Sequence, residues 1–181
     1  MVVLLEDECH LLWGDTCGYV WGPRGQAIEV EMTNQKARQT YYGAVNLLSR
    51  QVHVQEFAAG NADNTVAYLK WLQELYPGKK LLLLWDGASY HRDSQLQAFL
   101  AQVNAGLTES DWKLTLLRFA PNAPEQNPME DLWLAGKNHL RRCFAHNKTF
   151  AQVKACFRLF LSAFRLDSIK FDWYAPYPQI I

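Results

Sequence analysis

Apolar runs and polar segments alternate along the chain in an order that predicts a sheet covered by helices. Short apolar runs at Val2–Glu6, Leu81–Trp85 and Leu114–Phe119 are typical of strands buried in a sheet. Two further β-rich segments, Tyr41–Leu48 and Gln51–Phe57, are separated by only two residues. This short connection predicts that they pair as an antiparallel hairpin.

Helical hydrophobic spacing marks four more segments. Their expected starts are, in order, the polar caps within 61–64, Asp93 or Ser94, Asn127 or Pro128, and Thr149. Pro77-Gly78 ends the first helix, and Gln152 completes a capping box with Thr149 at the start of the last one. Ala27–Met32 predicts one more strand, and the tail after Asp167 is expected to be irregular. We therefore predict an α/β fold: a mixed sheet with an antiparallel hairpin portion and helices on both faces.

The composition fits one ordered globular domain. The chain has 181 residues, 49% of them apolar and 20% charged, so residues 1–181 are treated as a single domain with a real core. The longest apolar run, Leu81–Trp85, is far too short to cross a bilayer, and Met1–Leu5 lacks the basic start of a signal peptide. We expect a cytoplasmic protein that does not enter membranes. Because the formal net charge is +0, a nucleic-acid surface would need charge gathered on one face or supplied by another domain.

The four cysteines do not form a zinc-ribbon pattern, because no two of them are spaced as C-x-x-C. They are Cys9, Cys17, Cys143 and Cys156. His10 stands beside Cys9, and His139 precedes Cys143 by four residues, so metal ligation is one possible interpretation. On spacing alone we favour buried free cysteines in a reducing compartment.

Three acidic residues stand at positions suited to chemistry. Asp86 directly follows the apolar run 81–85, and ligands of open α/β sheets bind beyond the carboxyl ends of strands. Asp7 ends the first apolar run in the same way, and Glu130 lies in the first turn of a helix. Each also has a structural interpretation: a turn at Asp86-Gly87, a solvated strand end at Asp7, and a capping box from Asn127 to Glu130. If the strands that precede Asp7 and Asp86 are parallel neighbours in the sheet, these two carboxylates lie at the same edge.

Taken together, these segments resemble the mariner-like transposases of bacterial insertion sequences, which are DDE superfamily endonucleases with an RNase H-like fold. The resemblance extends over about residues 3–165, and its last block is the most specific. The resembling blocks are Glu6-Asp7-Glu8, Tyr19-Val20-Trp21-Gly22-Pro23-Arg24-Gly25, Leu84-Trp85-Asp86-Gly87-Ala88-Ser89-Tyr90-His91 and Ala120-Pro121-Asn122-Ala123-Pro124-Glu125-Gln126-Asn127-Pro128-Met129-Glu130-Asp131-Leu132-Trp133. The interval between the second and third acids is longer than is usual in the family, with the extra length expected around 104–113.

The resemblance implies that Asp7, Asp86 and Glu130 are the catalytic, metal-binding carboxylates of a DNA endonuclease and strand transferase. Two Mg²⁺ ions, for which Mn²⁺ can substitute, would stabilise the attacking and leaving oxygens of phosphodiester cleavage, with Asp86 bridging both. Without metal, three clustered acids would repel one another, so some of them should have raised pKa values. Asp131 should not share a metal with Glu130, and strand alternation should turn Glu8 to the face opposite Asp7.

DNA contact is expected from residues around these acids. The candidates are His91, Arg24, Lys137, Arg141 and Arg142. Lys137 and Arg141 are four residues apart and should share a helix face, which is suited to sequence-independent phosphate binding; a solvated helix face is the alternative. The partners implied are the element ends and the target DNA, acted on by a homodimer or larger assembly in the bacterial cytoplasm near the nucleoid.

Transposases of this type also carry an amino-terminal helix-turn-helix region, and no such region precedes the first catalytic strand here. We therefore expect this polypeptide alone to bind terminal repeats weakly. Two alternatives to an active transposase remain open. One is another RNase H-like nuclease, and the other is an inactive or domesticated copy that only binds DNA or a protein partner.

Overall fold

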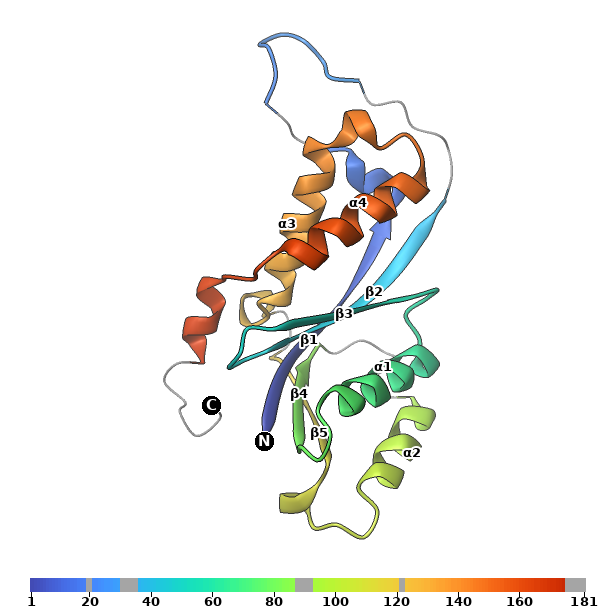
Figure 1. Cartoon of the computed structure of the whole chain (residues 1–181), viewed down its shortest axis with the longest axis vertical. Coiled ribbons are helices and arrows are strands. Elements are labelled where there is room, and N and C mark those ends of the chain that lie inside the picture. Colours follow the sequence, from blue (N-terminus) through green and yellow to red (C-terminus); the bar gives the residue numbers. More distant parts are fainter. Residues whose placement is uncertain (19–20, 30–35, 87–92, 121–122, 175–181) are drawn as a thin grey trace.

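A mixed five-stranded sheet forms the centre of the computed structural model, which describes residues 1–18, 21–29, 36–86, 93–120 and 123–174 (Figure 1). The strand order is β3-β2-β1-β4-β5. The strands are β1 (Val2–Leu12), β2 (Arg38–Asn46), β3 (Val52–Phe57), β4 (Leu81–Trp85) and β5 (Leu114–Arg118). β2 pairs antiparallel with both β1 and β3, whereas β4 pairs parallel with both β1 and β5. The predicted hairpin and the three predicted buried strands are therefore confirmed.

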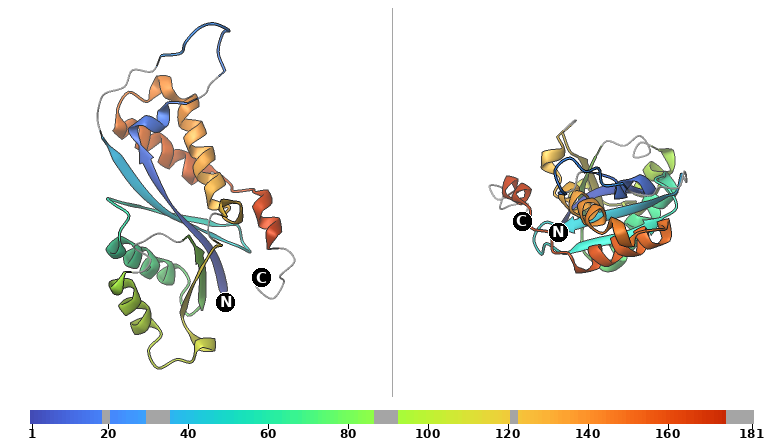
Figure 2. Two further views of the ribbon diagram at one scale, coloured as in Figure 1. Left: turned by 180° about the vertical axis from the view of Figure 1, so that it is seen from behind. Right: turned by 90° about the horizontal axis from the view of Figure 1, so that it is seen from above.

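Helices cover both faces of the sheet, as the sequence predicted (Figure 2). The helices are α1 (Ala62–Leu75), α2 (Ser94–Val103), α3 (Met129–Arg142) and α4 (Phe150–Ala163). Alternating strand residues divide the interior into two cores. Even-numbered positions of β1 such as Leu4 pack towards α1 and α2, and odd-numbered positions such as Leu5 pack towards α3 and α4.

β1 is longer than its apolar run predicted. The sequence indicated a strand ending at Glu6, but β1 continues through the acidic patch to Leu12, paired residue for residue with β2. The backbone of β2 satisfies the amide groups of β1 whatever side chains β1 carries, so acidic residues do not end the strand. Asp7 consequently lies inside the strand and not at its end. Of the strand expected at 27–32, residues 27–29 are not in a strand and 30–32 lie outside the described residues.

Side-chain caps fix the helix starts. Asn61 accepts a hydrogen bond from the Asn64 amide, Asp93 accepts one from Gln95, and Thr149 forms the predicted capping box with Gln152. Five short 3₁₀ helices complete the described secondary structure. They are η1 (Trp13–Thr16), η3 (Glu109–Asp111), η4 (Pro124–Gln126), η5 (Phe144–His146) and η6 (Ile169–Trp173). The last of these gives order to a tail that was expected to be irregular.

Contacts with Asp131 of α3 and with the Gln126 carbonyl hold residues 168–174 against the rest of the chain. Asp131 forms an ion pair with Lys170, with a separation of 2.8 Å between Oδ1 and Nζ, and accepts a hydrogen bond from Ser168. Tyr174 adds a hydrogen bond to the Gln126 carbonyl at 2.7 Å. Asp131 therefore faces η6.

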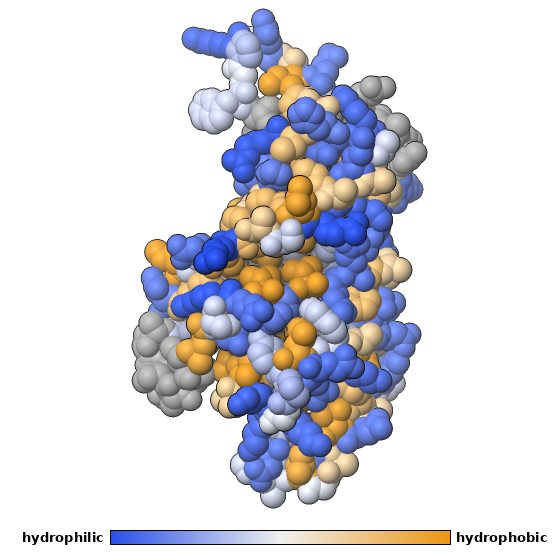
Figure 3. Space-filling model, in the orientation of Figure 1, coloured by the Kyte–Doolittle hydropathy of each residue, from blue (hydrophilic) through white to orange (hydrophobic). Residues whose placement is uncertain are grey.

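The surface carries apolar side chains between its polar ends. Figure 3 shows polar residues predominating at the two ends of the molecule, whereas apolar side chains gather in the middle of this face, where α4 approaches β3. Among the described residues, none of the helices is both long enough and apolar enough to cross a membrane.

Candidate active site

The parallel register of β1 and β4 brings the first two acids together. Leu5 lies opposite Leu84, so Asp7 and Asp86, each two residues further along, reach the same level of the sheet. Asp7 lies within β1, and Asp86 is the first residue after β4. Their carboxylate oxygens lie within 4.8 Å of each other. The sequence expectation that these two residues converge is confirmed.

Glu130 stands on α3, which starts against β1, but its carboxylate is not one of the group (Asp7, Glu8 and Asp86) whose oxygens all lie within 4.8 Å of one another. Asn127 is buried, and its side-chain amide donates a 2.8 Å hydrogen bond to the backbone carbonyl of Glu6. Its carbonyl oxygen accepts from the Met129 amide at 3.1 Å and so caps the helix. This one side chain joins the start of α3 to the strand position next to Asp7, and Glu130 is the neighbouring charge with the largest effect on Asp7. The sequence reasoning treated Asn127 only as a cap and missed this link.

Glu8 forms an acidic cluster with Asp7 and Asp86, which the sequence did not predict. It starts on the opposite face of β1 from Asp7, as alternation predicted, but its carboxylate lies within 4.8 Å of both Asp7 and Asp86. Glu8 is one residue beyond Asp7 on the same strand, and its longer side chain extends to the edge where β4 has ended. Alternation fixes where a side chain starts on a strand and leaves open where its terminal atoms reach.

Burial and mutual repulsion act on two carboxyl groups of β1. Burial, followed by the charges of Glu130, Glu8 and Asp86, raises the pKa of Asp7 well above its ordinary value. The pKa of Glu6 is raised for the same reasons, with burial again the largest cause. Glu6 is only 2% exposed, and within the described part of the chain neither of its carboxyl oxygens has a hydrogen-bond partner. The expected rise in pKa of a clustered acid is confirmed for Asp7.

Gly43 lets α3 lie close to the sheet over this cluster. It pairs with Asp7 across β1 and β2. A Cβ atom at Gly43 would stand 2.5 Å from Cε of Met129 and 2.6 Å from Cζ2 of Trp133. Both of these residues lie in the first two turns of α3 on either side of Glu130, so the missing side chain sets how closely Glu130 approaches β1.

Gly43→Ala is expected to lower the free energy of unfolding by about 1–3 kcal/mol, because the added Cβ overlaps buried side chains. It should also lower any metal-dependent activity, since α3 must move away from β1 and carry Glu130 with it. Urea denaturation and a nicking assay on the same preparation measure both effects. Gly14→Ala is the matched control, because a Cβ there meets nothing within 4 Å. Equal behaviour of the two variants would contradict this account of α3 placement.

The residues predicted to bind DNA lie in three different settings. His91 lies outside the described residues. Arg24 is exposed, in a segment (21–29) that projects beyond the ends of α3 and α4 (Figure 1). Lys137 pairs with Asp15 at 3.5 Å, Arg141 donates to the Cys17 carbonyl at 3.2 Å and to Asn138 at 2.8 Å, and Arg142 is exposed.

The predicted basic residues therefore fall into two groups, one with contacts inside the chain and one exposed to solvent. Lys137 and Arg141 hold η1 and the residues after it against the helix. Arg142 and Arg24 are exposed at the surface, where a phosphate can reach them. The DNA-binding role of all these residues stays a prediction.

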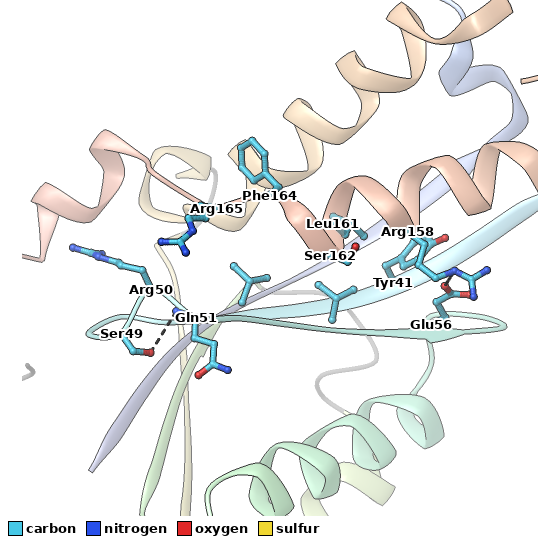
Figure 4. Close-up of a pocket in the computed structure, with 12 residues that line it drawn as sticks. Tyr41, Ser49, Arg50, Gln51, Glu56, Arg158, Leu161, Ser162, Phe164 and Arg165 are labelled. Carbon is cyan, nitrogen blue, oxygen red and sulfur yellow. Dashed lines mark hydrogen bonds and ion pairs between the residues drawn. The ribbon is translucent and has the colours of Figure 1, made fainter. Parts of the chain in front are cut away.

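A cavity of about 550 Å³ lies elsewhere, between the β2–β3 hairpin and α4 (Figure 4). Arg158 pairs there with Glu56 at 3.2 Å, and Arg50 and Arg165 lie towards the other end. None of the acids of the cluster lines it. The acidic site is therefore separate from this cavity.

The acidic cluster fits hard divalent cations. Mg²⁺ takes oxygen ligands at about 2.0–2.1 Å, so two ligands of one ion lie at most about 4.2 Å apart. The oxygens of Asp7, Glu8 and Asp86 need only small side-chain movements to meet this limit from their separation within 4.8 Å. A bound cation would also relieve the repulsion that raises the pKa of Asp7.

The sequence of residues 2–154 matches the family model described as "DDE superfamily endonuclease". The chain belongs to this family. No curated protein is similar enough in sequence to serve as a named relative. The fold of this DDE endonuclease chain is also similar to solved structures of the Mos1 transposase and of a viral intasome.

The crystal structure of the mariner Mos1 paired-end complex with Mg has a TM-score of 0.57 and 15% identity, over 99% of this chain and 52% of that one. The Mos1 transposase catalytic domain with Raltegravir and Mn has a TM-score of 0.55 and 13% identity, over 98% and 77%. A simian T-cell lymphotropic virus intasome in complex with a PP2A regulatory subunit has a TM-score of 0.53 and 9% identity, over 86% and 46%.

At these identities the similarity concerns the fold. The predicted RNase H-like class, with its mixed sheet and helices on both faces, is therefore confirmed. The DDE endonuclease chain spans about half the length of the Mos1 chain in the paired-end complexes.

Proposed function

We propose that this chain is the catalytic domain of a DNA transposase, which cleaves phosphodiester bonds at element ends and joins the freed 3′-hydroxyl to target DNA. The observation that supports the proposal is the approach of Asp7 on β1 to Asp86 at the end of β4, with the charge of Glu130 on α3 acting on Asp7. Asp7 and Asp86 lie within 4.8 Å of each other, and Glu130 is the strongest neighbouring charge on Asp7. Membership of the DDE superfamily endonuclease family supports the same chemistry.

Two Mg²⁺ ions, or Mn²⁺ in their place, would stabilise the charge that develops on the attacking and leaving oxygens. Asp86, the first residue after β4, would be one of the ligands that hold them. Asp7 and Glu130 would complete the ligand set from opposite sides, because one stands on the sheet and the other on the first turn of α3. Glu8 is a further proposed ligand, since its carboxylate shares the cluster.

The DNA would be held by cations away from the acids. Arg24 and Arg142 are candidates among the described residues because both are exposed, and Arg142 lies twelve residues after Glu130, about 18 Å along the helix axis. Lys137 and Arg141 would contribute less, since their side chains already hold Asp15 and the Cys17 carbonyl. We propose that two or more copies act together on paired ends, at the bacterial nucleoid where chromosomal targets are found. Mos1 itself is described in paired-end and strand-transfer complexes.

A strand-transfer assay tests the proposal. A labelled oligonucleotide ending in a 3′-hydroxyl is mixed with supercoiled plasmid, the 181-residue chain and Mn²⁺. The expected product is label joined covalently to plasmid, absent when Mn²⁺ is replaced by EDTA. Plasmid nicking without joining would identify a simple RNase H-like nuclease instead. Neither nicking nor joining by folded protein would favour a domesticated copy that only binds.

A further inference from the structure

A second cluster of ligand-type side chains lies where α3 ends against α4. His139 and Cys143 lie at the end of α3, and Cys156 lies in the middle of α4. One ligand atom from each lies within 4.8 Å of the other two. All three residues are partly buried, and both cysteines are free thiols.

The packing of α3 against α4 brings these three side chains together. Positions 139 and 143 are four residues apart and share one face of α3. Gly136, one turn earlier, allows α4 to pack closely, since a Cβ there would stand 2.4 Å from Cε2 of Phe157. The ring of His139 stacks on Phe160, with centroids 5.1 Å apart and planes inclined by 27°, which fixes its orientation. Cys156 adjoins Phe157 and is thereby brought to the same place.

The separations match tetrahedral coordination. Zinc binds sulfur at about 2.3 Å and imidazole nitrogen at about 2.0–2.1 Å, so tetrahedral angles put the two ligand atoms about 3.6 Å apart. Nε2 of His139 and Sγ of Cys143 are 3.7 Å apart. The thiol of Cys156, within 4.8 Å of both, needs to move by about 1 Å to complete a three-ligand set.

We propose that His139, Cys143 and Cys156 form a site for a borderline-soft divalent cation of the Zn²⁺ class, which joins α3 to α4 and leaves one coordination position for water. Thiolate and imidazole ligands select such ions, whereas the carboxylates at Asp7 and Asp86 suit Mg²⁺ and Mn²⁺. Cys143 lies thirteen residues after Glu130, or about 20 Å along the helix axis. The two sites are therefore separate in place and in chemistry.

The site would make α3 more rigid. A cation bound at the carboxyl end of α3 ties this helix to α4, while Asn127 ties its other end to β1. At a free concentration of about 100 times the dissociation constant, Zn²⁺ should raise the melting temperature by about 5–10 °C. The proposal does not depend on the transposase function, because the expected effect concerns folding alone.

Cobalt absorption tests the ligand set. The reduced, metal-free 181-residue chain is titrated with Co²⁺ and then with Zn²⁺. A thiolate-to-cobalt charge-transfer band should grow to one equivalent and be removed by Zn²⁺; carboxylate ligands give no such band. Cys143→Ser and Cys156→Ser should each abolish or greatly weaken it. Cys17→Ser, which changes an exposed cysteine outside the cluster, is the matched control and should keep it.

Thiol alkylation of the unmodified chain keeps the test independent of variant folding. Zn²⁺ should slow the alkylation of Cys143 and Cys156 by at least about tenfold and leave the alkylation rate of Cys17 unchanged. Equal alkylation rates with and without Zn²⁺, or no charge-transfer band in the folded chain, would overturn the proposal. A band retained in both Cys143→Ser and Cys156→Ser would overturn it as well, because other ligands would then hold the ion.

Discussion

Asp86→Asn is expected to lower the rate of Mn²⁺-dependent plasmid nicking by about three orders of magnitude while leaving the fold intact. Charge stabilisation by catalytic metal ions supplies several kcal/mol, and each 1.36 kcal/mol corresponds to a factor of ten in rate. Asp86 is exposed at the end of β4, so the change to an amide of the same size disturbs no core packing. Its carboxylate is the member of the cluster contributed by β4, opposite Asp7 and Glu8 of β1.

Asp111→Asn provides the matched control. Asp111 is exposed and pairs with Lys80 at 2.8 Å, a surface ion pair of small energetic value. Initial rates should be measured with both variants at the same protein concentration, with circular dichroism to confirm folding. Nicking that persists at the unmodified rate in Asp86→Asn would show that the activity comes from a contaminant or another site, and the proposed mechanism would fail.

The metal-free protein is expected to lose stability as the pH rises above the ordinary carboxyl pKa range, and Mn²⁺ is expected to restore it. Burial and neighbouring acids raise the folded-state pKa values of Asp7 and Glu6 above their ordinary values. A carboxyl group with a raised folded-state pKa binds its proton more tightly in the folded chain. Its contribution is therefore fully present below the unfolded-state pKa and is lost as the pH rises through the folded-state pKa. A cation among the ionised carboxylates replaces the missing protons.

Urea denaturation at several pH values, with and without Mn²⁺, measures this effect. At saturating Mn²⁺, about 100 times the dissociation constant, the gain at pH 8 should be about 2.7 kcal/mol. His53 acts in the opposite direction, because burial lowers its pKa and its contribution is lost at low pH. Comparison with Asp7→Asn separates the two, since this variant should lose most of the Mn²⁺ gain and show a flatter pH profile. An equal Mn²⁺ gain in Asp7→Asn would rule out cation binding at this cluster.

Local patterns in the sequence were sufficient for most of the fold. The run Leu81–Trp85 coincides with β4, and the caps at Asn61, Asp93 and Thr149 start the helices where they were expected. These signals are local because helix caps, turn residues and hydrophobic spacing act within a few positions of one another. The length of β1 was underestimated, because pairing with β2 depends on a segment more than 25 residues away.

The candidate site was predicted in part. Asp7 and Asp86 could be placed together from the sequence, since parallel strands present their carboxyl ends at one edge. Glu130 could be selected only through the family resemblance, because its local pattern is also that of a helix cap. Its approach to Asp7 depends on Asn127 bonding to β1 and on the absence of a side chain at Gly43. Neither contact leaves a signal in the local sequence pattern.

The sequence by itself determined the order of strands and helices, the two converging aspartates and the likeness to DDE endonucleases. Only the tertiary structure decided that Glu8 joins the acidic cluster and that Lys137 and Arg141 hold η1. It also brought Cys156 to His139 and Cys143. The physical reason is the same in each case: hydrophobic periodicity specifies which face of an element is buried, whereas the distance between side-chain ends depends on how separate elements pack together.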